Sequence, residues 1–147
     1  MGKISQIITG QPVYLDANVF IYALEAYPEF IPAITELFNL IDSGKLYAVT
    51  SQLTLAETLV KPFRDSNIHL QQAYQASLQN SDFLHVIEIN LTLLIEAARL
   101  RASHSQLRLP DAIHLATAYA HHCGTLVTND KRLKGMPGIN ILLLQES

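Results

Sequence analysis

The chain has 147 residues, of which 49% are hydrophobic and 16% are charged. This length suits one domain over residues 1–147, and the apolar content argues against an intrinsically disordered chain. The formal net charge of −3 gives no sign of a nucleic-acid binder that relies on overall positive charge. It does not exclude a phosphate substrate, because cations bound by acidic side chains become the largest local charges in such a site.

The chain offers few signals for a disulfide, a membrane span or export. Cys123 is the only cysteine, which excludes an intrachain disulfide and a cysteine-based metal cluster. No run of about 18 apolar residues is present, so no membrane span is expected. Residues 1–6 lack the apolar core of a secretory signal, and Gln6 does not fit a myristoylation motif. We therefore expect a cytoplasmic protein.

Short apolar runs alternate with longer amphipathic stretches along the chain. In chain order, this pattern predicts a strand over 13–15, helices over 19–26 and 30–40, a strand over 46–50, helices over 53–60 and 69–79, a strand over 83–89, helices over 91–100 and 110–122, and strands over 125–128 and 139–144. Gly44 is expected to end the second helix and Pro62 the third, whereas Pro110 suits the first turn of the last helix.

Strands separated by helices predict parallel pairing with right-handed crossovers. The middle strands are short, continuous apolar runs, as expected when helices cover both faces of a sheet. The expected fold is therefore α/β: a three-layer α/β/α sandwich with a central, mainly parallel sheet of about five strands.

Acidic residues fall at the ends of these predicted elements. Asp16 directly follows the first strand, and Asp130 follows the fourth. Glu57 lies in the first turns of the helix after the second strand, and Asp111 lies in the first turn of the helix opened by Pro110. In an open parallel sheet, strand C-termini and helix N-termini share one rim, and ligands bind there at the point where the strand order reverses. The four acids are thus expected to meet in one pocket.

Four carboxylates crowded together repel one another, and a divalent cation relieves that repulsion. Hard oxygen ligands favour Mg²⁺ or Mn²⁺ over Zn²⁺. The chemistry that fits such a site is phosphodiester hydrolysis, in which metal ions neutralise a phosphate oxygen and lower the pKa of a bound water.

Four segments carry a family resemblance: Leu15 to Phe20, Thr54 to Glu57, Leu109 to Ala118 and Leu126 to Asp130. Together, in this order, they resemble the PIN-domain ribonuclease family, with the VapC-like toxins of bacterial toxin–antitoxin pairs as the nearest subgroup. The resemblance spans nearly the whole chain, and its specificity lies in the series of motifs rather than in any one of them.

The resemblance implies a PIN-like fold and Mg²⁺- or Mn²⁺-dependent endonucleolytic cleavage of RNA. It implies that Asp16, Glu57, Asp111 and Asp130 are the catalytic, metal-binding acids, with Asn18 and Thr128 as supporting polar residues. It also implies a homodimer and, for a toxin, a small antitoxin partner that blocks the site.

Each acid also has a simpler interpretation. Asp16 and Asp130 are suited to capping helices or turns, and Asp111 suits the positive end of a helix dipole. Glu57 could be a solvated helix residue, although its apolar neighbours argue for burial, where an unpaired carboxylate is expensive. His114, one turn after Asp111, either flanks the site or is an ordinary core or rim histidine, and the second interpretation is favoured.

The basic and aromatic residues near these motifs also have two interpretations. The basic side chains either hold a phosphate backbone or are ordinary surface charges; they are Lys61, Arg64, Arg99, Arg101, Arg108, Lys131, Arg132 and Lys134. Tyr22 and Tyr27 either stack on a base or fill helix packing, and packing is favoured.

Two rival functions remain open. A phosphatase of the haloacid-dehalogenase type also places an aspartate after its first strand, but its second aspartate two positions later is replaced here by Asn18. A non-catalytic binding module that keeps the acids as a docking site or metal-stabilised scaffold is the other alternative.

Overall fold

We describe residues 3–145 of a computed structural model; Met1 and Gly2, which begin the N-terminal segment considered above, and Glu146 and Ser147 lie outside the described residues. Five strands form one sheet in the order β3-β2-β1-β4-β5, and every pair is parallel. The strands are β1 (Val13–Leu15), β2 (Ala48–Ser51), β3 (Leu84–Ile87), β4 (Thr125–Thr128) and β5 (Asn140–Leu143).

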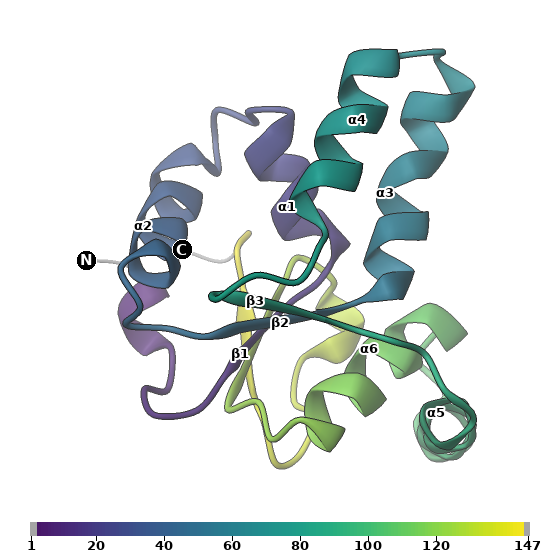
Figure 1. Cartoon of the computed structure of the whole chain (residues 1–147). Coiled ribbons are helices and arrows are strands. Elements are labelled where there is room, and N and C mark those ends of the chain that lie inside the picture. The colour runs from purple at the N-terminus through teal and green to yellow at the C-terminus, as the bar shows by residue number, and fades with distance from the viewer. Residues whose placement is uncertain (1–2, 146–147) are drawn as a thin grey trace.

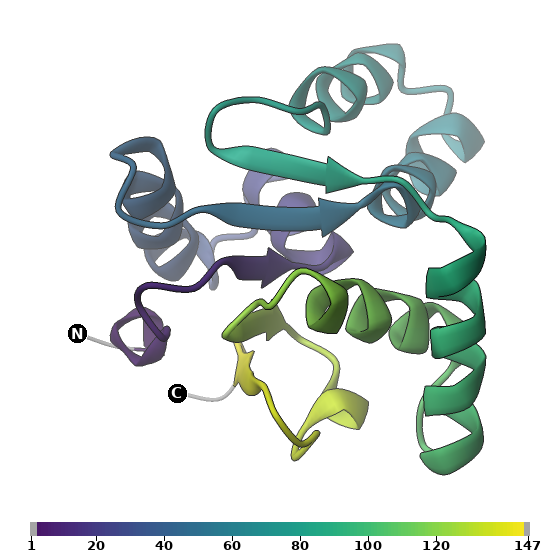
Figure 2. The same cartoon turned by 60° about the horizontal axis from the view of Figure 1, so that its bottom comes forward.

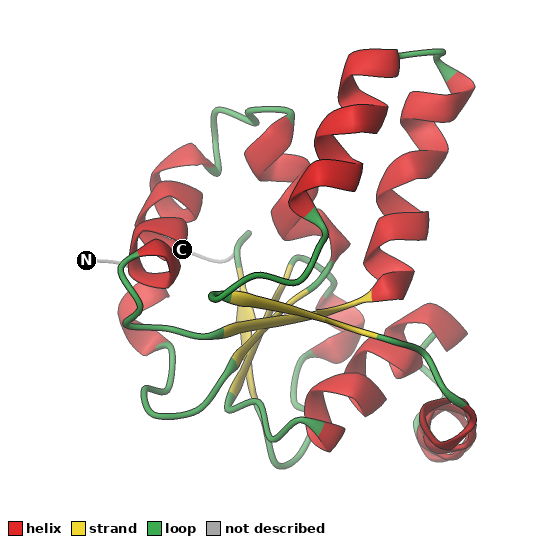
Figure 3. Cartoon of the chain, viewed as in Figure 1, coloured by secondary structure: helices red, strands yellow, loops and turns green. Residues whose placement is uncertain are grey.

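Helices surround this sheet in both views of the chain (Figures 1 and 2), and Figure 3 shows how strands and helices alternate along it. The α-helices are α1 (Ala17–Leu24), α2 (Ile31–Asp42), α3 (Gln52–Arg64), α4 (Ile68–Ser77), α5 (Leu91–Ser103) and α6 (Leu109–Ala120). Two short 3₁₀ helices, η1 (Lys3–Gln6) and η2 (Lys131–Leu133), complete the described elements.

The two faces of the sheet belong to two separate cores, because side chains alternate across a strand. Val13 and Leu15 of β1 join the core formed with η1, α1, α2 and α4. Tyr14, between them, joins the core formed with α5 and α6. Leu126 and Val127 of β4 divide between the two cores in the same way. This division confirms the predicted three-layer α/β/α sandwich.

The strand order reverses between β1 and β4. The chain runs outward from β1 through β2 to β3, then returns to the other side of β1 for β4 and β5. Leu15 pairs with Val127, so the residues that follow these two strands emerge side by side. Such a switch point is where open α/β sheets place their ligand sites.

The prediction that Pro62 ends its helix is wrong, because α3 continues through it to Arg64. The proline costs the helix a hydrogen bond to the Thr58 carbonyl. Its ring is nevertheless buried, and its own carbonyl accepts from the Asn67 backbone amide (2.8 Å) and from Gln71 Nε2 (3.1 Å). Tertiary packing at the turn into α4 thus outweighs the local penalty. The other predicted elements are present, with ends displaced by a few residues, and η1 was not predicted.

Gly44 ends α2 as expected. Its φ of +81° lies in the left-handed region that glycine adopts without steric cost. None of the helices within residues 3–145 is both long enough and apolar enough to cross a membrane.

Candidate functional site

Asp16 lies between β1 and α1 and caps the helix. Its Oδ1 accepts from the Asn18 backbone amide at 3.0 Å. Thr128, at the end of the neighbouring strand β4, donates its hydroxyl to Asp16 Oδ2. Asp16 is only 6% exposed. Burial raises its pKa to about 6, against the lowering effects of the Thr128 hydroxyl, His114 and the Asn18 amide.

Thr128 connects Asp16 to Asp130. Its Oγ1, fully buried, also accepts from the Asp130 backbone amide at 3.0 Å. Asp130 in turn caps η2, accepting from the Arg132 backbone amide at 2.9 Å and forming an ion pair with Arg132 Nη1 at 3.2 Å. Burial raises the pKa of Asp130, but the Arg132 amide, the neighbouring Asp111 carboxyl and the Arg132 charge together hold it below its ordinary value.

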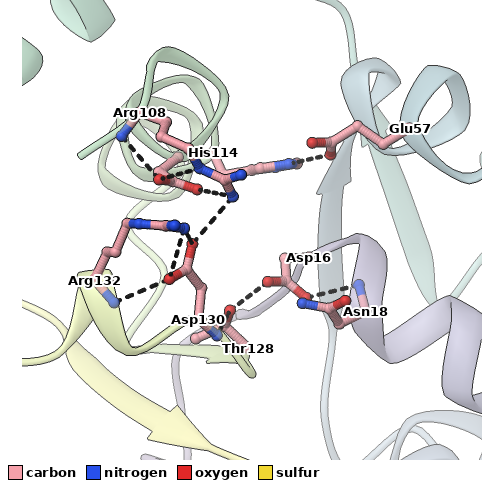
Figure 4. Close-up of polar contacts among 9 residues, drawn as sticks. Asp16, Asn18, Glu57, Arg108, His114, Thr128, Asp130 and Arg132 are labelled. Carbon is pink, nitrogen blue, oxygen red and sulfur yellow. Dashed lines mark hydrogen bonds and ion pairs between the residues drawn. The ribbon is translucent and has the colours of Figure 1, made fainter. Parts of the chain in front are cut away.

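Asp111 lies in the first turn of α6 and forms a reciprocal cap with Arg108. Asp111 Oδ2 accepts from the Arg108 backbone amide at 2.9 Å and from Arg108 Nε at 3.3 Å. The same guanidinium reaches Asp130, with Arg108 Nη2 3.4 Å from Asp130 Oδ2. Arg108 therefore bridges two of the predicted acids, as Figure 4 shows for its contact with Asp130.

Glu57 points from α3 toward His114 of α6 (Figure 4), and its Oε1 lies 2.6 Å from His114 Nε2. The other ring nitrogen, Nδ1, lies 2.6 Å from the Tyr14 hydroxyl on β1. His114 is buried, whereas the Glu57 side chain is one-third exposed. The contact places Glu57 on the same side of the sheet's C-terminal edge as Asp111, because His114 follows Asp111 by one helical turn.

Thr128 connects Asp16 to Asp130, and Arg108 connects Asp130 to Asp111, at the switch point of the sheet. Glu57 is not part of this chain of contacts; it contacts His114, which lies on the same helix as Asp111 (Figure 4). The pKa of Asp16 is raised mainly by burial, and the charge of Glu57 makes a smaller contribution in the same direction. Among residues 3–145, no three His, Cys, Asp or Glu side chains gather closely enough to hold one metal ion.

The residues nonetheless fit a divalent cation in chemistry. All four acids supply hard carboxylate oxygens, which Mg²⁺ and Mn²⁺ prefer. Asp16 is buried, and within the described part of the chain no lysine or arginine forms an ion pair with it. A buried carboxylate without a cationic partner is costly when ionised. Asp111 and Asp130, by contrast, already share the Arg108 guanidinium.

The supporting residues act differently from one another. Thr128 contacts Asp16 through its side chain, whereas Asn18 contacts it through its backbone amide. Two of the eight basic residues, Arg108 and Arg132, reach predicted acids. Tyr22 packs on Phe30, with ring centroids 4.1 Å apart, which agrees with the packing interpretation.

The sequence favoured an ordinary core or rim histidine for His114. The residue is buried, but its contacts with both Tyr14 and Glu57 were not predicted. Its position one turn after Asp111 was the available signal. The bridging position of Arg108 was missed as well; its place three residues before Asp111, in the geometry of a reciprocal cap, was the signal there.

A five-stranded parallel sheet with acids gathered beyond the ends of β1 and β4 defines an α/β protein whose site lies at the topological switch point. The model of the PIN domain family matches residues 13–139. The chain belongs to the PIN domain family.

Solved structures of toxins are similar to the chain in fold. A toxin–antitoxin complex from Klebsiella pneumoniae matches with 24% identity and a TM-score of 0.68, over 92% of this chain and 99% of that one. VapBC2 from Rickettsia felis, bound to a DNA fragment from its promoter, matches with 20% identity and a TM-score of 0.67, over 88% and 96%.

Mycobacterium tuberculosis VapC20, described as a toxin that cleaves the sarcin–ricin loop, matches with 16% identity and a TM-score of 0.66, over 81% of this chain and 90% of that one. A comparison with curated protein sequences gives no significant match. The resemblance to PIN-domain proteins, with VapC toxins as structural neighbours, is confirmed.

Proposed function

We propose that this protein is a divalent-metal-dependent endoribonuclease that cleaves RNA phosphodiester bonds. The observation that supports the proposal is the chain of contacts from Asp16 through Thr128, Asp130 and Arg108 to Asp111 at the switch point of the sheet. Glu57, held by His114 on the helix that carries Asp111, is proposed as the fourth acid of the site. The PIN family membership and the similarity to a toxin that cleaves the sarcin–ricin loop support it.

In this proposal, the four acids hold Mg²⁺ or Mn²⁺. The bound metal would neutralise phosphate charge and supply a water of lowered pKa. Thr128 keeps the Asp16 carboxylate oriented, and it favours the ionised form by donating a hydrogen bond. Asn18 holds the other oxygen of Asp16 through its backbone. Arg108 and Arg132, both at the rim, provide positive charge for the RNA backbone.

The chain is further proposed to act as the toxin of a toxin–antitoxin pair, with a small antitoxin as its partner. The complexes from Klebsiella pneumoniae and Rickettsia felis support this step, because both contain such a pair. We also propose that the chain forms a homodimer.

Light scattering on the purified chain tests whether it is a dimer. The toxin role is tested by expressing the chain in bacteria alone and together with the product of a neighbouring small gene. Expression alone should stop growth, and co-expression should restore it.

The activity is tested by incubating the purified chain with single-stranded RNA and with a structured RNA hairpin, with and without Mn²⁺. We expect internal cleavage that requires Mn²⁺, is abolished by EDTA and disappears in Asp16→Asn. Asp82→Asn, which changes an exposed acid remote from the site, should cleave like the wild type. Equal cleavage by wild type and Asp16→Asn would identify a contaminating nuclease and refute the proposal.

A non-catalytic binding module is the second candidate, and one observation favours it. Arg108 occupies the space between Asp111 and Asp130, and the described acids do not form a ready-made chelate. A chain that binds Mn²⁺ or a partner but leaves all tested RNA intact would support this alternative. The phosphatase alternative has no support from the PIN family match, and turnover of a chromogenic phosphomonoester without RNA cleavage is the outcome that would favour it.

A further inference from the structure

A histidine held at both ring nitrogens joins three elements of the fold. His114 on α6 contacts the Tyr14 hydroxyl on β1 through Nδ1 and the Glu57 carboxylate on α3 through Nε2, each at 2.6 Å. Tyr14 is fully buried and His114 is 5% exposed. Water therefore has little access to the contact between Tyr14 and His114, and hydrogen bonds at both ring nitrogens fix the orientation of the imidazole.

The proton arrangement follows from the Tyr14 hydroxyl. Burial, followed by the charge of Asp16, raises the pKa of Tyr14 well above its ordinary value, so the phenol keeps its proton. A phenol that donates to Nδ1 requires the imidazole N–H to be at Nε2. Nε2–H then donates to Glu57 Oε1. In this arrangement Tyr14, His114 and Glu57 each have a hydrogen-bond partner.

We propose that His114, supported by Tyr14, is a positioning residue that holds Glu57 Oε1 and leaves Oε2 available for the divalent cation. This inference rests on the proposed function, in which Glu57 is a metal ligand. The Glu57 side chain is one-third exposed and has several rotatable bonds. Without a fixed partner, ordering it on a cation costs rotamer entropy. A buried donor removes that freedom before the cation arrives.

Residues that do not touch a metal ion can still affect how tightly it binds. Groups that hydrogen-bond a metal ligand from behind fix its orientation, and their loss weakens metal affinity about 10- to 100-fold. Here His114 hydrogen-bonds to the Glu57 carboxylate and is not itself a proposed metal ligand. Tyr14 in turn hydrogen-bonds to His114 and selects the tautomer in which His114 donates to Glu57.

Two amide substitutions at residue 114 separate positioning from packing. The amide nitrogen of Gln reaches about as far as Nε2 of histidine, whereas that of Asn reaches only as far as Nδ1. We therefore expect His114→Asn to bind Mn²⁺ about 10- to 100-fold more weakly than the wild type. His114→Gln should restore most of that loss, because it keeps a donor for Glu57. His69→Asn, an exposed histidine on α4, serves as the control and should bind Mn²⁺ like the wild type.

Tyr14→Phe provides a second variant that keeps the ring and removes only the hydroxyl. It should fold, weaken Mn²⁺ binding by about tenfold, and change the ¹⁵N spectrum of His114 by releasing the tautomer. In the wild type, long-range ¹H–¹⁵N correlation spectra should show Nε2 protonated and Nδ1 bare, both without metal and with Mg²⁺. Circular dichroism confirms that each variant is folded before its affinity is compared.

The Mn²⁺ affinities of wild type and variants distinguish a failure of the proposed function from a failure of the proposed role of His114. Mn²⁺ binding is measured by titration calorimetry, which does not depend on RNA cleavage. If the wild type binds no Mn²⁺, the proposed function fails and this inference fails with it. If the wild type binds Mn²⁺ and folded His114→Asn and Tyr14→Phe bind it equally well, only this inference is overturned. A wild-type spectrum with the proton on Nδ1 would also overturn it.

Discussion

Arg108 and Asp130 are 22 residues apart in the sequence, yet Nη2 of Arg108 lies 3.4 Å from Oδ2 of Asp130. The same guanidinium contacts Asp111 through Nε at 3.3 Å. An arginine of the chain itself therefore lies between two carboxylates that we propose as metal ligands. The contacts are long, and the Arg108 side chain is 61% exposed, so moving it into solvent costs little.

Replacing Arg108 by alanine should tighten Mn²⁺ binding. The guanidinium and a divalent cation compete for Asp111 and Asp130, and exposed ion pairs of this kind are each worth about 0.2–1 kcal/mol. Removing two such contacts, together about 0.4–2 kcal/mol, predicts a dissociation constant lower by about twofold to 30-fold. Titration calorimetry checks this, with Arg101→Ala on α5 as the control. Weaker Mn²⁺ binding in Arg108→Ala would show instead that Arg108 arranges the acids for the metal.

Because Asp16 is buried, we expect the free energy of unfolding of the metal-free protein to decrease as the pH rises from about 4 to about 6. Its pKa is raised from 3.8 to about 6 in the folded chain. Between these values the folded state binds more protons than the unfolded state, so the free energy of unfolding decreases with increasing pH. The difference of about two units corresponds to roughly 3 kcal/mol.

Asp16→Asn should remove this decrease and be the more stable protein at pH 7, because asparagine is also a good helix N-cap. Urea unfolding of wild type and variant across this pH range measures the effect. Asp82→Asn should follow the wild type. The lowered pKa of Asp130 contributes stability that is lost only as the pH falls below about 4, outside the window. A variant curve parallel to that of the wild type would contradict the prediction.

Thr128→Val should weaken both the fold and the metal site. Valine has nearly the same shape, but it removes the donor to Asp16 and the acceptor of the Asp130 amide. Leaving buried polar groups unpaired costs about 1–3 kcal/mol. The pKa of Asp16 should rise further, because the Thr128 hydroxyl lowers it. Urea unfolding and Mn²⁺ calorimetry at pH 7 test both effects. Thr128→Ser keeps the hydroxyl and should retain metal affinity; equal losses in both variants would point to packing alone.

Removing the hydroxyl of Tyr74 should lower the free energy of unfolding without changing the candidate metal site. Its ring is fully buried on α4, and its hydroxyl donates to Glu25 Oε2 at 2.5 Å, at the end of α1. Tyr74→Phe should lower the free energy of unfolding by about 1.5–3 kcal/mol, as expected for a hydrogen bond to a charged group. Mn²⁺ affinity should stay at the wild-type value. The control is Tyr47→Phe, which changes an exposed ring; a similar loss there would contradict the assignment.

The order of strands and helices could be predicted from the sequence because each element carries a local pattern. The run Val13, Tyr14 and Leu15 predicts a buried strand, and in the structure all three side chains are buried. Parallel pairing followed from the helices between strands. The sequence wrongly predicted that the helix ends at Pro62, because it shows only the hydrogen bond that a proline removes from a helix. The hydrogen bonds that the Pro62 carbonyl accepts from Asn67 and Gln71 depend on how α4 folds back.

For the candidate site, the sequence alone determined which acids follow the strands and begin the helices, because those positions are properties of single elements. Only the tertiary structure decided that Arg108 lies between Asp111 and Asp130, and that buried His114 contacts both Tyr14 and Glu57. Such contacts depend on how α6 lies against α3 and the sheet. Distances between side chains of different elements arise from packing of the whole chain, which no local periodicity encodes.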